Sequence, residues 1–296
     1  MQKLRVLYFG TPYFAADLLE KIITDKKIHV KIVAVVTKPD AKVGKTQLLT
    51  ASPVKKIAEK YGVDVLYDYQ DSFLKYVKEN KIDLALLFAY GKIIPEHILA
   101  AVKYGFWIVH PSLLPKYKGA FPFAYVLIND EKKTGVTLIQ ADEGIDTGEI
   151  IGQKDLSIKP DERRPELIDR LVDLGYELFK NVVQNFVQSR YKLSTNKQEK
   201  SNYPDTKKLV REQGFVALEA LKNAINKDGK KIYNLYRGLY PWPGIWSIVN
   251  IKGQEKRLKI NSLLLENNKI IIEKVQLEGK KEVDFKTFNL AYKVFI

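Results

Sequence analysis

Residues 109–119 read Val109-His110-Pro111-Ser112-Leu113-Leu114-Pro115-Lys116-Tyr117-Lys118-Gly119. This stretch ends an apolar run at His110 and then enters a loop bounded by prolines. About thirty residues later, after another apolar run, Asp142–Gly148 places two aspartates among glycines. In an α/β fold, acid–base groups such as an imidazole and a carboxylate often lie at the carboxyl ends of strands, where they face a crevice. The two stretches predict an α/β protein with His110 and Asp146 in one site.

The sequence around these stretches alternates between strand and helix patterns. A helix over 53–61 is expected to begin with Ser52 as N-cap and Pro53 in its first turn. Buried strands are predicted at 4–9, 31–36, 63–66 and 82–88, and an amphipathic helix at 14–23. Because nearly continuous apolar strands alternate with helices, the pattern favours a doubly wound parallel sheet.

The character of the sequence changes after residue 158. A long amphipathic helix is predicted over 165–186, followed by a polar stretch without periodicity. Beyond it we expect a helix near 232–239 and strands at 245–251, 256–265 and 269–275, which suggests a small β barrel. We therefore expect a catalytic domain over 1–193, a linker over 194–206 and a second domain over 207–296.

The composition excludes several classes of protein. The 296 residues include no cysteine, which excludes disulfides, thiolate metal ligands and a cysteine nucleophile. Three histidines without His-x-x-x-His spacing argue against a metal site. No apolar run approaches the roughly 18 residues of a membrane-spanning helix, and the first residues enter a strand pattern rather than a signal peptide. We expect a cytoplasmic monomer that does not associate with membranes.

The net charge of +14 is unevenly distributed. Residues 203–296 hold 18 Lys and Arg against 10 Asp and Glu, a net charge of +8 on about a third of the chain. An excess of this size indicates a polyanionic partner, most simply nucleic acid. An ordinary lysine-rich surface explains the composition equally well.

Several other motifs are explained as well by an ordinary structural role as by a functional one. Gly10-Thr11-Pro12 after the first strand lacks a Gly-x-Gly-x-x-Gly pattern, and Gly44-Lys45-Thr46 lacks the upstream glycine of a phosphate-binding loop. A histidine beside a strand is more often structural than catalytic, and Asp–Gly pairs favour turns. Trp242 and Trp246 are expected to pack in the core rather than stack on nucleic acid.

The order of several motifs resembles that of the methionyl-tRNA formyltransferase family along nearly the whole chain. The matching pieces are Phe9–Ala15, Lys38–Asp40, Ser52–Lys55, Ala89–Gly91, His110–Gly119, Thr134–Thr137, Asp142–Gly148 and Pro241–Gly244. The resemblance implies a Rossmann-like catalytic domain and a small OB-like C-terminal domain. It also implies transfer of a formyl group from 10-formyltetrahydrofolate to the α-amine of methionylated initiator tRNA, without a metal.

The resemblance also implies roles for individual residues. His110 would take the amine proton or support the oxyanion, and Asp146 would orient it. Contacts to the folate are implied for Phe88, Tyr90, Ser112, Leu113, Leu114, Pro115 and Asp142. Contacts to tRNA are implied for Lys38, Lys42, Lys45 and Arg257, the first three in or beside an insertion at 38–49.

The chain departs from the family at Ile108. The family has an asparagine there, on the same strand face as the histidine. This asparagine donates a hydrogen bond to the formyl oxygen. Isoleucine has no donor, and loss of one oxyanion-hole donor typically costs about 10²–10³ in rate. The insertion also has Ala41, Thr46, Gln47 and Leu48 where the family is rich in Arg, Gly and Lys.

Three functions therefore stay open from the sequence. The first is a tRNA formyltransferase. The second is a formyltransferase that acts on an amino-sugar nucleotide, against which the basic C-terminal region argues. The third is a catalytically impaired paralogue that binds tRNA or folate, which Ile108 favours.

Overall fold

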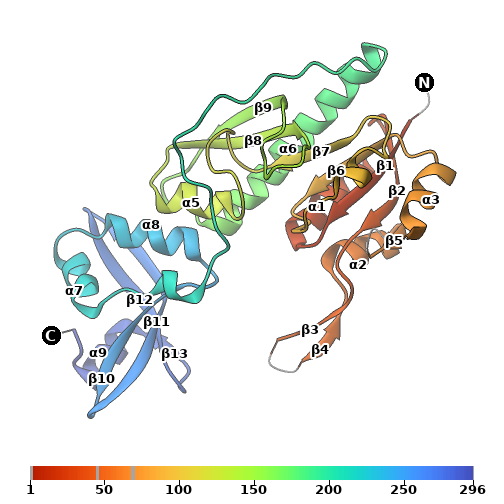
Figure 1. Ribbon diagram of the computed structural model, residues 1–296. Helices are drawn as coiled ribbons and strands as arrows, with labels where there is room; N and C mark the ends of the chain where they lie inside the picture. The colour runs from red at the N-terminus through yellow and green to blue at the C-terminus, as the bar shows by residue number, and fades with distance from the viewer. Residues whose placement is uncertain (1–2, 45–46, 68–70, 296) are drawn as a thin grey trace. The chain divides into compact units, whose positions relative to one another are not determined.

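A computed structural model describes residues 3–44, 47–67 and 71–295 (Figure 1). These residues form two compact units. Unit 1 comprises residues up to 119 together with 133–156 and 168–205. Unit 2 comprises 120–132, 157–167 and 206–296. Two short segments, 120–132 and 157–167, thus belong to the unit that contains the C-terminal strands.

Unit 1 contains a seven-stranded sheet in the order β5–β2–β1–β6–β7–β8–β9. The strands are β1 (Leu4–Gly10), β2 (Val30–Val36), β5 (Asp64–Leu66), β6 (Leu84–Phe88), β7 (Phe106–His110), β8 (Lys133–Gln140) and β9 (Ile150–Ser157). The first five in spatial order are parallel, and β8 runs antiparallel to β7. The strand order reverses between β1 and β6, where doubly wound folds bind ligands at the carboxyl ends.

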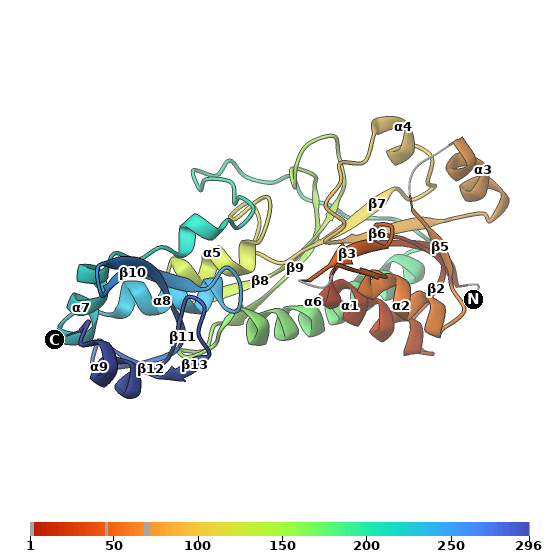
Figure 2. The same cartoon turned by 90° about the horizontal axis from the view of Figure 1, so that it is seen from below.

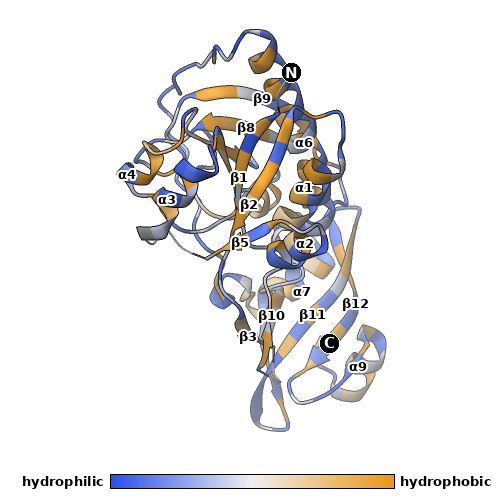
Figure 3. Ribbon diagram, turned by 90° about the vertical axis from the view of Figure 1, so that its right-hand side faces the viewer, coloured by the Kyte–Doolittle hydropathy of each residue, from blue (hydrophilic) through white to orange (hydrophobic). Residues whose placement is uncertain are grey.

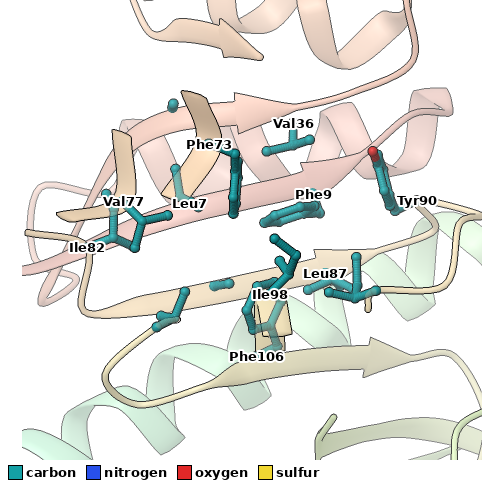
Figure 4. Packing of buried hydrophobic residues seen from close by; sticks show 14 residues of the cluster. Leu7, Phe9, Val36, Phe73, Val77, Ile82, Leu87, Tyr90, Ile98 and Phe106 are labelled. Atoms are coloured by element: carbon teal, nitrogen blue, oxygen red, sulfur yellow. The ribbon is translucent and has the colours of Figure 1, made fainter. Parts of the chain in front are cut away.

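Alternation of side chains along the strands gives the sheet two apolar faces. On one face, Phe9 packs edge-on against Phe73 at a centroid distance of 6.3 Å, within a buried cluster that also includes Phe106 (Figure 4). Helix α3 (Asp71–Glu79) and the short α4 (Glu96–Leu99) supply side chains to this cluster. Because both Phe106 and Ile108 pack there, His110 belongs to the same strand face.

Three further helices contribute to the opposite face or pack beside it. Fully buried Trp107 packs edge-on against Phe179 and Phe186 of α6 (Arg164–Gln188), and Phe88 packs on Phe14 of α1 (Tyr13–Thr24). Helix α2 (Pro53–Lys60) packs beside α1. The predicted doubly wound sheet is therefore confirmed, with helices on both faces.

Helix α2 begins as its sequence predicts. The Ser52 hydroxyl accepts a hydrogen bond from the Lys55 backbone N–H at 3.1 Å, and Pro53 occupies the first turn. Ser52 also shares a 2.8 Å hydrogen bond with the buried hydroxyl of Thr37. The cap thereby joins the helix to the end of β2.

Unit 2 is built around a four-stranded antiparallel sheet in the order β10–β11–β12–β13 (Figure 2). The strands are β10 (Ile245–Ile251), β11 (Gln254–Glu266), β12 (Lys269–Leu277) and β13 (Glu282–Asp284). The other elements are α5 (Pro122–Ile128), η1 (Arg211–Gly214), α7 (Leu218–Asn226), α8 (Lys230–Leu239) and α9 (Phe285–Tyr292). A Rossmann-like sheet followed by a small C-terminal β unit confirms the predicted fold class.

Hydrophobic residues gather along the strands of the unit 1 sheet, whereas helices such as α2 and α3 mix both kinds of residue (Figure 3). The longest helix, α6, has 25 residues and is amphipathic. Within the described ranges, no helix combines the length and apolarity needed to cross a membrane.

Candidate active site

His110 lies at the carboxyl end of β7 with only 4% of its side chain exposed. Its Nδ1 is 3.3 Å from Oδ2 of Asp146, and its Nε2 is 2.9 Å from the backbone carbonyl oxygen of Tyr117. The predicted partners His110 and Asp146 are therefore adjacent, although 36 positions separate them in the chain.

Asp146 is held in place through its carboxylate, and its backbone has an uncommon conformation. Its Oδ2 also accepts a 2.8 Å hydrogen bond from the Gly119 backbone N–H. Its φ of +53° lies in the left-handed region, which few residues other than glycine adopt. Burial acts to raise the pKa of this carboxyl, but the charge and hydrogen bond of His110, the Gly119 N–H and Lys118 outweigh burial and lower the pKa. Asp146 is thus an anion facing the imidazole.

The hydrogen-bond partners define what the imidazole presents. A carbonyl oxygen can only accept, so Nε2 of His110 donates to Tyr117. Since Asp146 is ionised, Nδ1 is also best satisfied as a donor. Both ring nitrogens therefore face acceptor oxygens, and this arrangement suits a donor to a developing oxyanion better than a base.

The loop 112–115 is held in shape by Thr137, the last residue of the motif Thr134–Thr137. The Thr137 hydroxyl donates to the Ser112 carbonyl at 2.7 Å and accepts from the Leu114 N–H at 3.1 Å. Gln153 donates to Thr137 and to the Leu114 carbonyl, at 2.8 and 2.9 Å. Thr137 lies directly opposite His110 in the β7–β8 ladder, so one strand pair supports both features. No sequence signal singled out Gln153.

The predicted folate-binding residues differ in what they expose. Ser112 is fully buried and donates to the Lys116 carbonyl at 2.8 Å, and Leu114 is also buried. Leu113 and Pro115 are half-buried. Any ligand at this loop would therefore meet Leu113, Pro115 and the backbone rather than the Ser112 hydroxyl.

Phe88 and Tyr90 also turn their side chains into the core. Phe88 packs on Phe14 and Tyr90 packs edge-on against Phe9, with ring centroids 5.3 and 5.4 Å apart. Both residues are at most 3% exposed. Between them, Ala89 has a φ of +54°, so the chain turns sharply here at the end of β6.

Asp142 lines a pocket of about 470 Å³ on unit 1. The other lining residues are Glu96, Leu99, Ala100, Glu143 and Gly144. Ligand pockets are typically about 300–1,000 Å³, and carboxylates accept hydrogen bonds from the N–H groups of a heterocycle such as a pterin. One carboxylate oxygen of Asp142 already accepts from the Gly144 N–H and the Thr147 hydroxyl, which orders this loop.

The predicted insertion forms an antiparallel hairpin of β3 (Ala41–Val43) and β4 (Leu48–Thr50). Lys38 precedes it and Lys42 lies on β3, and both are exposed. Leu48 and Leu49 are also exposed, at 66% and 70%. Lys45 and Thr46 lie outside the described residues.

On unit 2, Arg257 is half-buried on β11, opposite Ile248 of β10. The neighbouring pair is Trp246 opposite Lys259, and Phe215 packs on Trp246 at 5.0 Å. The expected core position is wrong for Trp242, which is 51% exposed. The prolines on both sides keep its segment out of a regular strand, so the ring is not turned inward by pleating.

Within the described ranges, no group of three His, Asp or Glu side chains is arranged to hold a metal ion.

The model of the formyl transferase family matches residues 2–183. The chain belongs to this family. It is 36% identical over 267 residues to a methionyl-tRNA formyltransferase of Thermodesulfovibrio yellowstonii, covering 89% of this chain and 81% of that protein. The predicted family is thus confirmed, and the similarity extends well past the residues that the family model matches.

Solved structures share the fold at lower identity. The methionyl-tRNA formyltransferase from Clostridium thermocellum superposes with a TM-score of 0.57 at 19% identity, covering 93% of this chain and 98% of that one. An N-formyltransferase from Helicobacter canadensis, in complex with folinic acid and dTDP-3-aminofucose, gives a TM-score of 0.59 at 22% identity, covering 90% and 89%. These likenesses concern the fold alone.

Proposed function

We propose that this protein transfers a formyl group from 10-formyltetrahydrofolate to the α-amine of methionyl initiator tRNA. The observation that carries the proposal is the buried His110–Asp146 pair at the carboxyl end of β7, in a chain of the formyl transferase family. The acceptor is indicated by the 36% identical relative, which is named methionyl-tRNA formyltransferase.

In this reaction the amine attacks the formyl carbon, and negative charge develops on the formyl oxygen. The bond from that carbon to N10 of the folate then breaks, and the proton lost by the amine passes to N10, so that tetrahydrofolate leaves. We propose that His110 donates to that oxygen through Nε2, exchanging the Tyr117 carbonyl for the substrate. Asp146 holds the ring in place and stabilises positive charge on it when the ring is protonated. This assignment gives the site an oxyanion donor even though Ile108 supplies none.

The donor and acceptor are proposed to bind on different elements. The Asp142 pocket and the loop 112–115 would hold the folate, with Phe88 and Tyr90 contributing through the turn between them. Lys38, Lys42, Lys45 and Arg257 would contact tRNA phosphates. We retain the catalytic domain as 1–193, the linker as 194–206 and the tRNA-binding domain as 207–296. With these substrates the enzyme would act in the cytoplasm, as a monomer.

The test is single-turnover formylation of methionylated initiator tRNA with 10-formyltetrahydrofolate at low salt. We expect product well above the rate without enzyme, and a large fall in the single-turnover rate in His110→Ala and in Asp146→Asn. Near-normal turnover in either variant would contradict the assigned roles.

The second candidate function is that of a catalytically impaired protein that binds tRNA or folate. It is favoured by Ile108, which has no donor group and packs against the apolar cluster of unit 1. A catalytically impaired binder would retain tRNA affinity but give no product in the same assay. Formylation of a dTDP-linked amino sugar, with none of the tRNA, would instead indicate the amino-sugar reaction.

A further inference from the structure

The segment that follows α6 lies against the start of β9 and the loop that carries Asp146. Asn196 and Ile150 exchange two backbone hydrogen bonds of 2.8 Å as an antiparallel bridge. The Thr195 hydroxyl donates to the carboxylate of Glu149. A polar stretch of this composition reads as a linker, yet here it is attached residue by residue to the catalytic loop.

Gln198 makes the contact nearest to the site. Its Nε2 donates to the backbone carbonyls of Asp146 and Gly148, each at 2.8 Å. These two carbonyls stand on either side of Thr147, so one side-chain amide spans the turn. Among the described residues, the Oε1 atom of Gln198 is buried and has no hydrogen-bond partner, so the two carbonyls are the hydrogen-bond contacts of this amide.

This contact bears on catalysis because Asp146 has a left-handed backbone. Such a conformation is disfavoured for L-residues and persists only where the surroundings hold it. The direction of the carboxylate depends on that backbone, and its Oδ2 must reach both the Gly119 N–H and Nδ1 of His110. Gln198 fixes the backbone end of Asp146, while Gly119 and His110 fix the carboxylate end.

We propose that Gln198 is a positioning residue that acts through Asp146 to hold His110 in its reactive orientation. The predicted effect on turnover rests on the proposed formyl transfer, whereas the effect on Asp146 does not. In this role Gln198 sets the orientation of one aspartate, whereas a purely structural residue would affect the stability of the whole fold.

Gln198→Met removes the donor at nearly the same side-chain length. We expect kcat to fall by about 10- to 100-fold, as displacement of a catalytic group does, with KM for folate and tRNA near wild type. Gln198→Lys keeps a donor and should retain most of the turnover. Gln188→Met makes the same chemical change at an exposed position of α6 and should leave turnover unchanged. An unchanged kcat in Gln198→Met, or a loss confined to KM, would overturn the proposal.

A double-mutant cycle separates action through Asp146 from general disturbance. If Gln198 acts through Asp146, adding Gln198→Met to Asp146→Asn should lower the single-turnover rate little further. Losses that multiply in the double variant would mean that the two residues act independently, and the proposal would be wrong. Gln198→Glu, which also lacks the donor, replaces Gln198→Met if the latter does not fold.

A measurement without substrate keeps this inference distinct from the proposed function. The Gly119 amide donates to Asp146, so its hydrogen exchange reports whether the carboxylate stays in place. We expect faster exchange of this amide in Gln198→Met and no change in Gln188→Met. If the wild type does not formylate methionyl-tRNA, the proposed function fails, and the exchange rate still decides the inference. Unchanged Gly119 protection in Gln198→Met would overturn it.

Discussion

At the scale of single residues, Ile108 and His110 together decide how an oxyanion could be stabilised. They lie on one face of β7, where Ile108 pairs with Leu87 and Ile139 in the neighbouring strands. An apolar residue at 108 leaves the protons of His110 as the side-chain donors on this strand face. The rate of the reaction should therefore respond to a donor added at position 108.

Ile108→Asn places an amide beside His110 on that face. We expect the single-turnover formylation rate to rise, by up to about 10²-fold if the amide reaches the oxygen. The polar group will also destabilise the fold by about 1–3 kcal/mol, because Ile108 packs against the apolar cluster.

Ile108→Val is the matched control, since it shortens the side chain without adding a donor. It should leave the formylation rate near wild type. An equal rate in Ile108→Asn and Ile108→Val would mean that the amide does not reach the oxygen or that His110 already suffices.

Asp146 should also affect stability in a pH-dependent way. Its folded-state pKa is lowered, so its ionised form stabilises the fold above the ordinary value near 3.8, and this contribution is lost as the pH falls through the folded pKa. The difference in unfolding free energy between wild type and Asp146→Asn should be constant above about pH 5 and shrink below about pH 4. Urea unfolding at a series of pH values measures it. A difference that grows toward low pH would contradict the assigned direction.

At the scale of elements, the β7–β8 pair joins His110 to the loop 112–115, where we propose that the folate binds. The antiparallel register sets His110 opposite Thr137, whose hydroxyl bonds both Ser112 and Leu114. The loop shape therefore depends on a strand that lies more than twenty residues further along the chain.

Thr137→Val removes this hydroxyl without changing the side-chain shape. We expect a raised KM for 10-formyltetrahydrofolate and a stability loss of about 1–3 kcal/mol, because the buried groups of the loop lose their partner. Thr137→Ser keeps the hydroxyl and should restore KM. Steady-state kinetics and urea unfolding of both variants test this, and a KM that is normal in Thr137→Val would show that the loop does not depend on the hydroxyl.

At the scale of the whole molecule, the basic charge of residues 203–296 is the main indication of a polyanionic partner. On unit 2, Arg257 and Lys259 lie on the same face of β11, opposite Ile248 and Trp246. Cations beside aromatic and apolar groups are typical of β surfaces that bind nucleic acid.

Arg257→Ala should therefore weaken tRNA binding and reduce the slope of log Kd against log salt by about one. Lys286→Ala, on α9, removes the same charge elsewhere on unit 2 and should leave the slope unchanged. Equal slopes in wild type and Arg257→Ala would remove Arg257 from the tRNA contacts. Equilibrium binding at several salt concentrations makes the comparison.

Periodicity predicted the strongly patterned elements well. The strand expected at 245–251 coincides with β10, and the helix expected at 165–186 falls within α6. The hairpin at 41–50 was not predicted as strands, because three-residue strands are too short to show alternation. The exposure of Trp242 was missed because burial depends on tertiary neighbours, which a proline-rich segment does not specify.

By itself the sequence determined the order of the elements, the family, and the pair His110 and Asp146, because apolar periodicity and motif order are local properties of the chain. The tertiary structure alone decided that both imidazole nitrogens meet acceptors, that Thr137 fixes the loop 112–115, and that Gln198 holds the backbone of Asp146. Each of these contacts joins residues distant in the chain or depends on the orientation of a single side chain. Only the packed fold determines such distances and directions.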